Sequence, residues 1–186
     1  SDHFATSLWT VPSGSANTTI SGLSFAPDWL ITKNRTHGYE GSVYDTVRGD
    51  DKYLKLFSNS GNAAEATAAT RVNLTSDGFV LEADNDNSNY NAGSASVGWA
   101  WNAGTSTASN TDGNITSSVR ANQAAGFSIV SFNLSVTNTE KSIGHGLNAV
   151  PTFYIIKNRS SVDNWYVYTT AVDGTLDFRF LNTTDT

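Results

Sequence analysis

An internal repeat sets the organisation of this chain of 186 residues. A Gly-Leu pair, a proline and the tripeptide Lys-Asn-Arg occur twice in the same order. The first copy holds Gly22-Leu23, Pro27 and Lys33–Arg35, and the second holds Gly146-Leu147, Pro151 and Lys157–Arg159. Each element of the second copy lies 124 residues after its counterpart, and Val167-Tyr168 follows Val43-Tyr44 at the same spacing. Self-similarity at a fixed spacing indicates duplicated structural units.

Short apolar runs separated by turn residues fill both copies. Trp29–Thr32 and Phe153–Ile156 are rich in β-branched and aromatic residues and short enough for buried strands. In the segment 97–101, Val97, Trp99 and Trp101 alternate with small residues, so they share one strand face, and we expect Trp99 and Trp101 in the core. Strands recurring every 8–12 residues or so, with little helix, predict an all-β chain of tandem antiparallel β-sandwich units, jelly-roll-like in form.

The repeat also predicts the domain organisation. We expect a first β-sandwich unit over residues 1–104, a Ser/Thr/Asn/Gly-rich connector over 105–126 and a partial second unit over 127–186. The second copy has no counterpart of the stretch from Gly78 to Gly104, and a sandwich without those strands has open edges. We therefore expect the chain to be part of a longer one, with the second unit completed by residues beyond Thr186 or by a neighbouring subunit.

Composition excludes several kinds of partner. The net charge is −6, and no run of Lys or Arg is long enough to follow a phosphate backbone, so we expect no nucleic-acid partner. No apolar stretch approaches the roughly 20 residues that span a bilayer, so we expect no membrane partner. There is no cysteine, which rules out disulfides and thiolate metal sites.

Much of the chain resembles a known kind of repeat domain. The matching segments are Pro27–Arg35, Tyr44–Gly49, Leu56–Ser60, Asp77–Phe79, Val97–Gly104, Asn110–Ile115, Ala125–Val130, Gly144–Leu147, Pro151 and Lys157–Arg159. In this order they resemble an uncharacterised repeat domain of structural and tail-fibre proteins of tailed bacteriophages, often marine phages and cyanophages. The resemblance carries no catalytic residues with it.

This resemblance implies a non-enzymatic virion structural protein, a tail-fibre, tail or decoration component that acts through subunit assembly. Its partners would be copies of itself, other virion proteins or both, and its location would be the extracellular virion. The alternative is a glycan-binding or receptor-binding module on a phage or cell-surface fibre. A polysaccharide hydrolase is a third possibility, which no motif in the sequence supports.

Each candidate site has a structural interpretation beside the functional one. The Lys-Asn-Arg tripeptides could hold a carboxylate or a sugar acid, but turn chemistry after a buried strand explains them, and we favour that interpretation. The segment Asp84–Asn89 could offer oxygen ligands to Ca²⁺, but it lacks the glycine and glutamate of an EF-hand loop, and we favour a solvated loop.

The remaining polar residues point to no reaction. His3, His37 and His145 do not have the spacing of a metal site, and Asp45 and Arg48 are interpreted as a local ion pair. We expect no catalytic, cofactor-binding or metal-binding residues. A sugar-stacking platform could use the aromatic residues Trp9, Trp29, Tyr39, Tyr90, Trp99, Trp101, Trp165 and Tyr166. Of these, Tyr39 and Tyr90 lie in Gly/Asn-rich stretches and are the better surface candidates.

Overall fold

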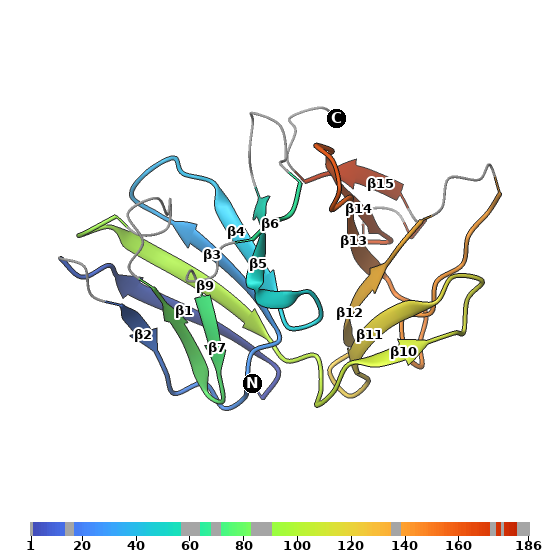
Figure 1. Ribbon diagram of the computed structural model, residues 1–186, viewed down its shortest axis with the longest axis horizontal. Coiled ribbons are helices and arrows are strands. Elements are labelled where there is room, and N and C mark those ends of the chain that lie inside the picture. Colours follow the sequence, from blue (N-terminus) through green and yellow to red (C-terminus); the bar gives the residue numbers. More distant parts are fainter. Residues whose placement is uncertain are drawn as a thin grey trace.

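The protein is built from β-strands. A computed structural model describes residues 2–13, 17–56, 64–67, 72–82, 91–134, 139–171, 174–175 and 177–181. These residues form fifteen strands, every named pair of which is antiparallel, and they include no helix (Figure 1). The all-β class expected from the sequence is confirmed. No helix long and apolar enough to cross a membrane occurs in this described part.

The first half is a two-layered sandwich. One layer is a six-stranded sheet in the order β1 (Phe4–Thr10), β9 (Ala95–Trp101), β3 (Trp29–Asn34), β4 (Gly41–Asp45), β5 (Gly49–Leu56) and β6 (Ala66–Thr67). The other layer is a three-stranded sheet in the order β2 (Thr18–Ile20), β8 (Gly78–Leu81) and β7 (Val72–Thr75).

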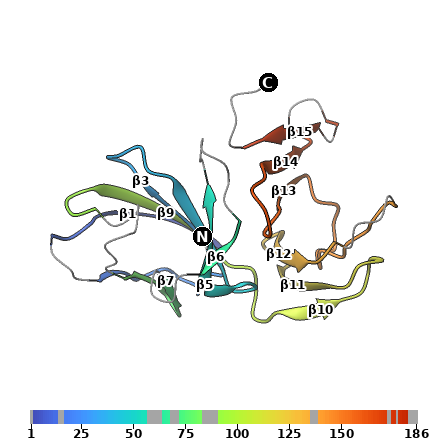
Figure 2. The ribbon, with the colours of Figure 1, turned by 45° about the horizontal axis from the view of Figure 1, so that its top comes forward.

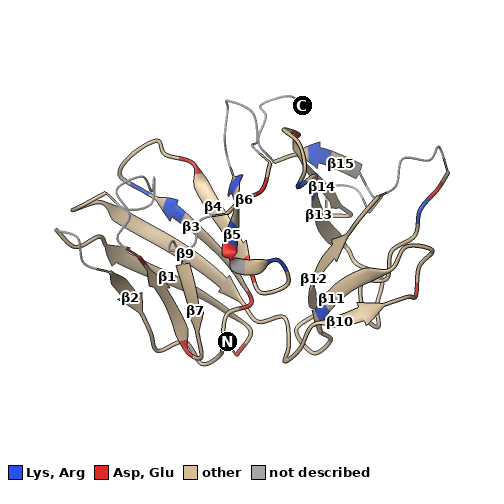
Figure 3. Cartoon of the chain, viewed as in Figure 1, with Lys and Arg blue, Asp and Glu red and all other residues tan. Residues whose placement is uncertain are grey.

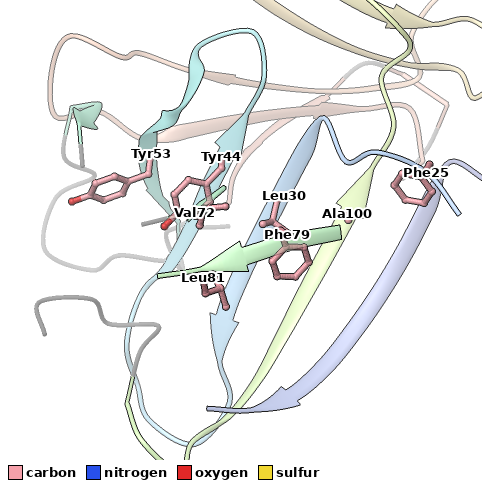
Figure 4. Close-up of a cluster of buried hydrophobic side chains, with 8 residues drawn as sticks. All are labelled: Phe25, Leu30, Tyr44, Tyr53, Val72, Phe79, Leu81 and Ala100. Atoms are coloured by element: carbon pink, nitrogen blue, oxygen red, sulfur yellow. The ribbon is translucent and has the colours of Figure 1, made fainter. Parts of the chain in front are cut away.

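The core of the first half lies between these two layers. Leu30 and Tyr44 from the large sheet meet Phe79 and Leu81 from the small one, and Leu30, Tyr44 and Phe79 are 0% exposed (Figure 4). Burying one such side chain contributes about 1.5–3 kcal/mol. Gly98 leaves little free space, because a Cβ there would lie 3.1 Å from Phe79 and 3.2 Å from Trp9. Strand β9 therefore packs closely under β8.

Strand β9 turns its large residues away from this core. Ala100 is buried in the core cluster, so Val97, Trp99 and Trp101 lie on the opposite face, and both tryptophans are only half-buried. Trp101 instead contacts Trp29 (4.8 Å between ring centroids) and Phe127 (6.1 Å). The expectation that Trp99 and Trp101 form the core was wrong. Alternation shows which residues share a face, but not which face is enclosed.

The second half consists of two three-stranded sheets. One contains β10 (Ala108–Asn110), β11 (Ser117–Asn122) and β12 (Phe127–Phe132), and the other contains β13 (Phe153–Lys157), β14 (Trp165–Thr169) and β15 (Asp177–Phe180). The segment 105–126, interpreted from its composition as a connector, thus carries two strands. Threonine is among the residues enriched in strands, so a Ser/Thr-rich composition does not by itself separate a connector from a strand.

The second half packs on the outer face of the six-stranded sheet (Figures 1 and 2). Trp165 is 4% exposed and lies in a cluster with Val43, Leu54 and Leu56. Its indole nitrogen donates a hydrogen bond of 2.9 Å to the carbonyl oxygen of Lys55. Both faces of the large sheet are therefore covered at this point, one by β2–β8–β7 and the other by β13–β14–β15.

Candidate functional site

The duplication is visible in the strand pairing. In the hairpin β3–β4, Leu30 pairs with Tyr44, and in β13–β14 Tyr154 pairs with Tyr168, which are the residues 124 positions later. Gly22 and Gly146 also share a left-handed backbone, with φ of 84° and 71°. The segments Trp29–Thr32 and Phe153–Ile156 thus occupy corresponding strands, as expected. However, β3 is central in its sheet, whereas β13 is an edge strand.

Both Lys-Asn-Arg tripeptides close a turn in the same way. The Asn34 Oδ1 atom accepts backbone N–H bonds of 2.9 Å from Thr36 and His37, and Asn158 Oδ1 accepts one of 2.9 Å from Ser160. In each copy the lysine amine donates to the carbonyl oxygen of the following asparagine, at 3.0 Å from Lys33 and 2.8 Å from Lys157. The structural interpretation of Lys-Asn is confirmed.

The two arginines of these tripeptides differ. Arg35 is exposed, whereas Arg159 forms a two-pronged ion pair with Glu65, with Nε 2.9 Å from Oε2 and Nη2 2.8 Å from Oε1. The Arg159 Nη1 atom also donates to Ser131 Oγ at 2.6 Å. Arg48 Nη1 reaches Glu65 Oε2 at 3.0 Å, and Arg48 is paired in turn with Asp45. We call Asp45, Arg48, Glu65 and Arg159 the ion network.

The ion network is internally satisfied. Partial burial raises the pKa of Glu65, but hydrogen bonds and charge from Arg159 and Arg48 outweigh this and hold the pKa below 4.5. The same Glu65 contact is the largest effect raising the pKa of Arg159, against the opposing effect of burial. Because Glu65 and Arg159 come from different halves, the ion network joins the two halves. Each arginine already binds a carboxylate, so the network is poorly suited to binding an anion.

A second ion pair also joins the halves. Asp28 is 1% exposed, and its Oδ1 lies 2.7 Å from Arg120 Nε in β11. Asp28 Oδ2 accepts the backbone N–H of Ala103 at 2.8 Å, and Arg120 Nη2 donates to Gly104 O at 2.8 Å. These contacts tie Asp28, just before β3, to Arg120 in β11, and so link the two halves.

The outward face of β13–β14–β15 is aromatic. Because Ile155 and Trp165 point toward the first half, alternation and strand pairing place six residues on the other side. They are Tyr154, Ile156, Tyr166, Tyr168, Phe178 and Phe180, and we call them the aromatic face. Ring centroids are 4.7 Å apart in Tyr154–Tyr168 and 5.2 Å apart in Tyr166–Phe180. Phe178 is 52% exposed and Ile156 37%.

The corresponding face of the first half is enclosed. Leu30, Thr32 and Tyr44 are each 0% exposed beneath β2–β8–β7, whereas their counterparts Tyr154, Ile156 and Tyr168 lie on the aromatic face. Burial, and to a smaller extent the neighbouring Tyr168, raises the pKa of Tyr154. The negative charge of Asp163 is the largest effect raising the pKa of Tyr166, and burial adds to it. These tyrosines are therefore neutral hydrogen-bonding groups at physiological pH.

Sequence reasoning named only Tyr166 on this face. The sequence does contain a signal for the other five residues, because large apolar residues recur at every second position in each of the three strands. The pairs are Tyr154 and Ile156, Tyr166 and Tyr168, and Phe178 and Phe180. Glu65, the centre of the ion network, carried no sequence signal, because its partner Arg159 lies 94 positions away.

A smaller cluster surrounds Tyr39, one of the predicted surface aromatics. Tyr39 is 40% exposed and stacks on His37, with ring centroids 5.3 Å apart. Its hydroxyl accepts a hydrogen bond of 3.2 Å from the Asn91 amide, and Lys33 Nζ donates to its carbonyl oxygen at 2.5 Å. Tyr90 and Asp84–Asn89 lie outside the described residues. Trp9, another predicted platform residue, packs against Phe79 instead.

The three histidines are dispersed. The His3 ring contacts Asn122, that of His37 contacts Ser94, and His145 Nδ1 accepts the backbone N–H of Leu147. Among the described residues, no three His, Cys, Asp or Glu side chains converge as metal ligands would. Charged residues are sparse on the ribbon (Figure 3).

These features define a class, an all-β domain in which a sandwich carries a partly duplicated and more open second half. The chain belongs to a family described as a domain of unknown function (DUF7483), whose model matches residues 1–186. No curated protein and no solved structure matches the chain. The family match runs through both halves and the segment between them, and the division at residues 104 and 126 stays a prediction.

Proposed function

We propose that this domain is a non-enzymatic structural module that acts by assembly with other protein subunits. The observation that carries the proposal is the aromatic face, whose counterpart in the first half is a sandwich core. On this face Phe178 and Ile156 are exposed and the other four residues are half-buried, and contiguous apolar surface that is open to solvent marks sites of protein association. Tyrosine and phenylalanine bury large areas at low entropic cost and are enriched at such interfaces.

The proposed setting is a phage particle, in which the domain would be a tail-fibre, tail or decoration component. This part of the proposal rests on the sequence resemblance. The partners would be further copies of the chain, other virion proteins or both. A charged fraction of only 15% is compatible with dense packing of many copies, since long-range repulsion between subunits is weak.

Sedimentation velocity over a range of concentrations tests the assembly proposal. We expect the wild-type chain to associate and the double variant Ile156→Ser, Phe178→Ser to shift toward the monomer. Leu8→Ser is the matched control, because Leu8 is 65% exposed on the first half. A wild-type chain that stays monomeric at every concentration, with an aromatic face that binds no partner protein, would contradict the proposal.

A glycan-binding role is the second candidate, and the Tyr39 cluster favours it. An exposed ring beside an amide and an amine offers a stacking surface together with hydrogen-bond donors. A glycan-array screen followed by titration of Tyr39→Ala tests this role. We expect the variant to lose any binding that the wild type shows, and a wild-type chain that binds no glycan on the array would eliminate this candidate.

A further inference from the structure

Strand β9 holds the large sheet of the first half together. It lies between β1 and β3 and is antiparallel to both. Ala100 pairs with Ala5 on one side and Leu30 on the other, and Gly98 pairs with Ser7 and Thr32. Every backbone amide along β9 thus faces one of two partner strands.

The counterparts of β1 and β3 in the second half are β12 and β13. The register of β13–β14 establishes the second equivalence. For the first, the β12 sequence FSIVSF parallels FATSLW in β1, at a spacing one residue shorter than that of the repeat (Phe127 against Phe4). However, among the described residues β12 pairs with β11 and β13 with β14, and within this described part neither strand has a counterpart of β9 beside it.

Strands β12 and β13 nevertheless lie near each other and run in the same direction. The turn before β12 is joined to the segment before β13, where Asn148 Nδ2 donates to Gln123 Oε1 at 2.8 Å. Their far ends are joined by Arg159 Nη1, which donates to Ser131 Oγ at 2.6 Å. Since β11 occupies one edge of β12, the other edge faces β13, as both views show (Figures 1 and 2).

We propose that a strand from another protein subunit inserts between β12 and β13, antiparallel to both, in the position that β9 has in the first half. This inference rests on the proposed assembly function and specifies the chemistry of the partner. The inserted segment would resemble β9, with small residues alternating with large apolar ones. Added strands bind through main-chain hydrogen bonds, and side-chain pockets give them specificity.

The pattern of the inserted strand follows from its neighbours. Gly98 is crowded by Trp9 in the first half, and Phe132 takes the place of Trp9 in β12. Since Phe127 points toward Trp29, alternation turns Phe132 outward, to the same side as Ile156. Beside Phe132 we therefore expect a small residue on this outward side of the inserted strand, as Gly98 is beside Trp9, whereas the other side can carry aromatic residues, as β9 does with Trp99 and Trp101.

Binding of a β9 peptide tests the inference directly. The probe is a fluorescent peptide of residues Ser94–Asn102 with a lysine tail for solubility, titrated with the intact chain and followed by anisotropy. Two further peptides carry N-methyl groups on alternate backbone amides, one set for each edge. We expect each set to weaken binding by about tenfold or more, because each removes hydrogen bonds to one of the two neighbours.

A disulfide measures the register. The chain contains no cysteine, so a single introduced thiol is unambiguous. Gly98 pairs with Thr32, whose counterpart is Ile156. We therefore expect a peptide with cysteine in place of Gly98 to form a disulfide with the Ile156→Cys chain. The matched control is the Tyr154→Cys chain, which should prefer a peptide with cysteine in place of Ala100.

Two results would overturn the inference. Sensitivity to only one set of N-methyl groups would mean that the peptide adds to a single edge. Absence of binding at saturating peptide, with unchanged amide exchange in β12 and β13, would mean that the position accepts no strand. Neither result affects association through the aromatic face, so the proposed function would still stand or fall on sedimentation of the Ile156→Ser, Phe178→Ser variant.

Discussion

The two halves of this domain contain the same hairpin in different surroundings. In the first half, β3–β4 sits inside a six-stranded sheet, and Leu30 and Tyr44 are enclosed by a second layer. In the second half, β13–β14 keeps the pairing register, but Tyr154 and Tyr168 form part of an open face. The comparison shows that local pairing can be preserved while burial is set by strands elsewhere in the chain. The second half depends on the first half for one side of its packing.

The two halves should differ most in how much stability is lost when a large side chain is truncated to alanine. Phe79→Ala removes a side chain that is 0% exposed, and we expect a loss of about 3–5 kcal/mol in the free energy of unfolding. Phe178→Ala removes one that is 52% exposed and should cost less than about 1 kcal/mol in the monomer. Urea denaturation at low protein concentration measures both. Equal losses would mean that the aromatic face is enclosed in solution.

The next effect tests the contact between the halves. Glu65→Gln leaves Arg48 and Arg159 without their shared carboxylate, and we expect it to cost about 1.5–3 kcal/mol, the range for hydrogen bonds to charged groups. The control is Arg35→Ala, the exposed counterpart of Arg159, which should change stability by less than about 0.5 kcal/mol. If both variants unfold at the same urea concentration, the ion network does not stabilise the domain.

How far the sequence predicted these features depends on the range of the interaction. The all-β class and the asparagine turns after β3 and β13 follow from residues close together in the chain, and the structure bears them out. The repeat is read directly from the sequence, and the shared register of β3–β4 and β13–β14 agrees with it. The enclosed side of β9 and the Glu65–Arg159 contact depend on segments that meet only in three dimensions. The strands in 105–126 were missed because Ser and Thr suit both a loop and a strand near the surface.

Gly22 and Gly146 have the same backbone conformation but different surroundings, so they allow the cost of backbone strain to be compared with the cost of crowding. Gly22 and Gly146 have φ of 84° and 71°, so alanine at either site should cost about 1–2 kcal/mol through backbone strain. At Gly146 the added Cβ would also lie 2.9 Å from Val119 Cγ1, whereas at Gly22 it meets nothing within 4 Å. We expect Gly146→Ala to be the more destabilising by about 1 kcal/mol. Thermal unfolding compares the two, and equal costs would show that the second half relaxes around the added methyl group.

The smallest expected effect is a dependence on pH. The pKa of Glu65 lies below 4.5 in the folded protein. The unfolded state therefore binds the proton more readily, and the stability that Glu65 contributes is fully present above the unfolded pKa and is lost as pH falls through the folded one. We expect the free energy of unfolding of the wild type to fall more steeply below pH 4.5 than that of Glu65→Gln. Urea titrations of both proteins at a series of pH values measure this difference. Parallel curves would mean that Glu65 keeps its ordinary pKa and that Arg159 and Arg48 only offset the cost of its burial.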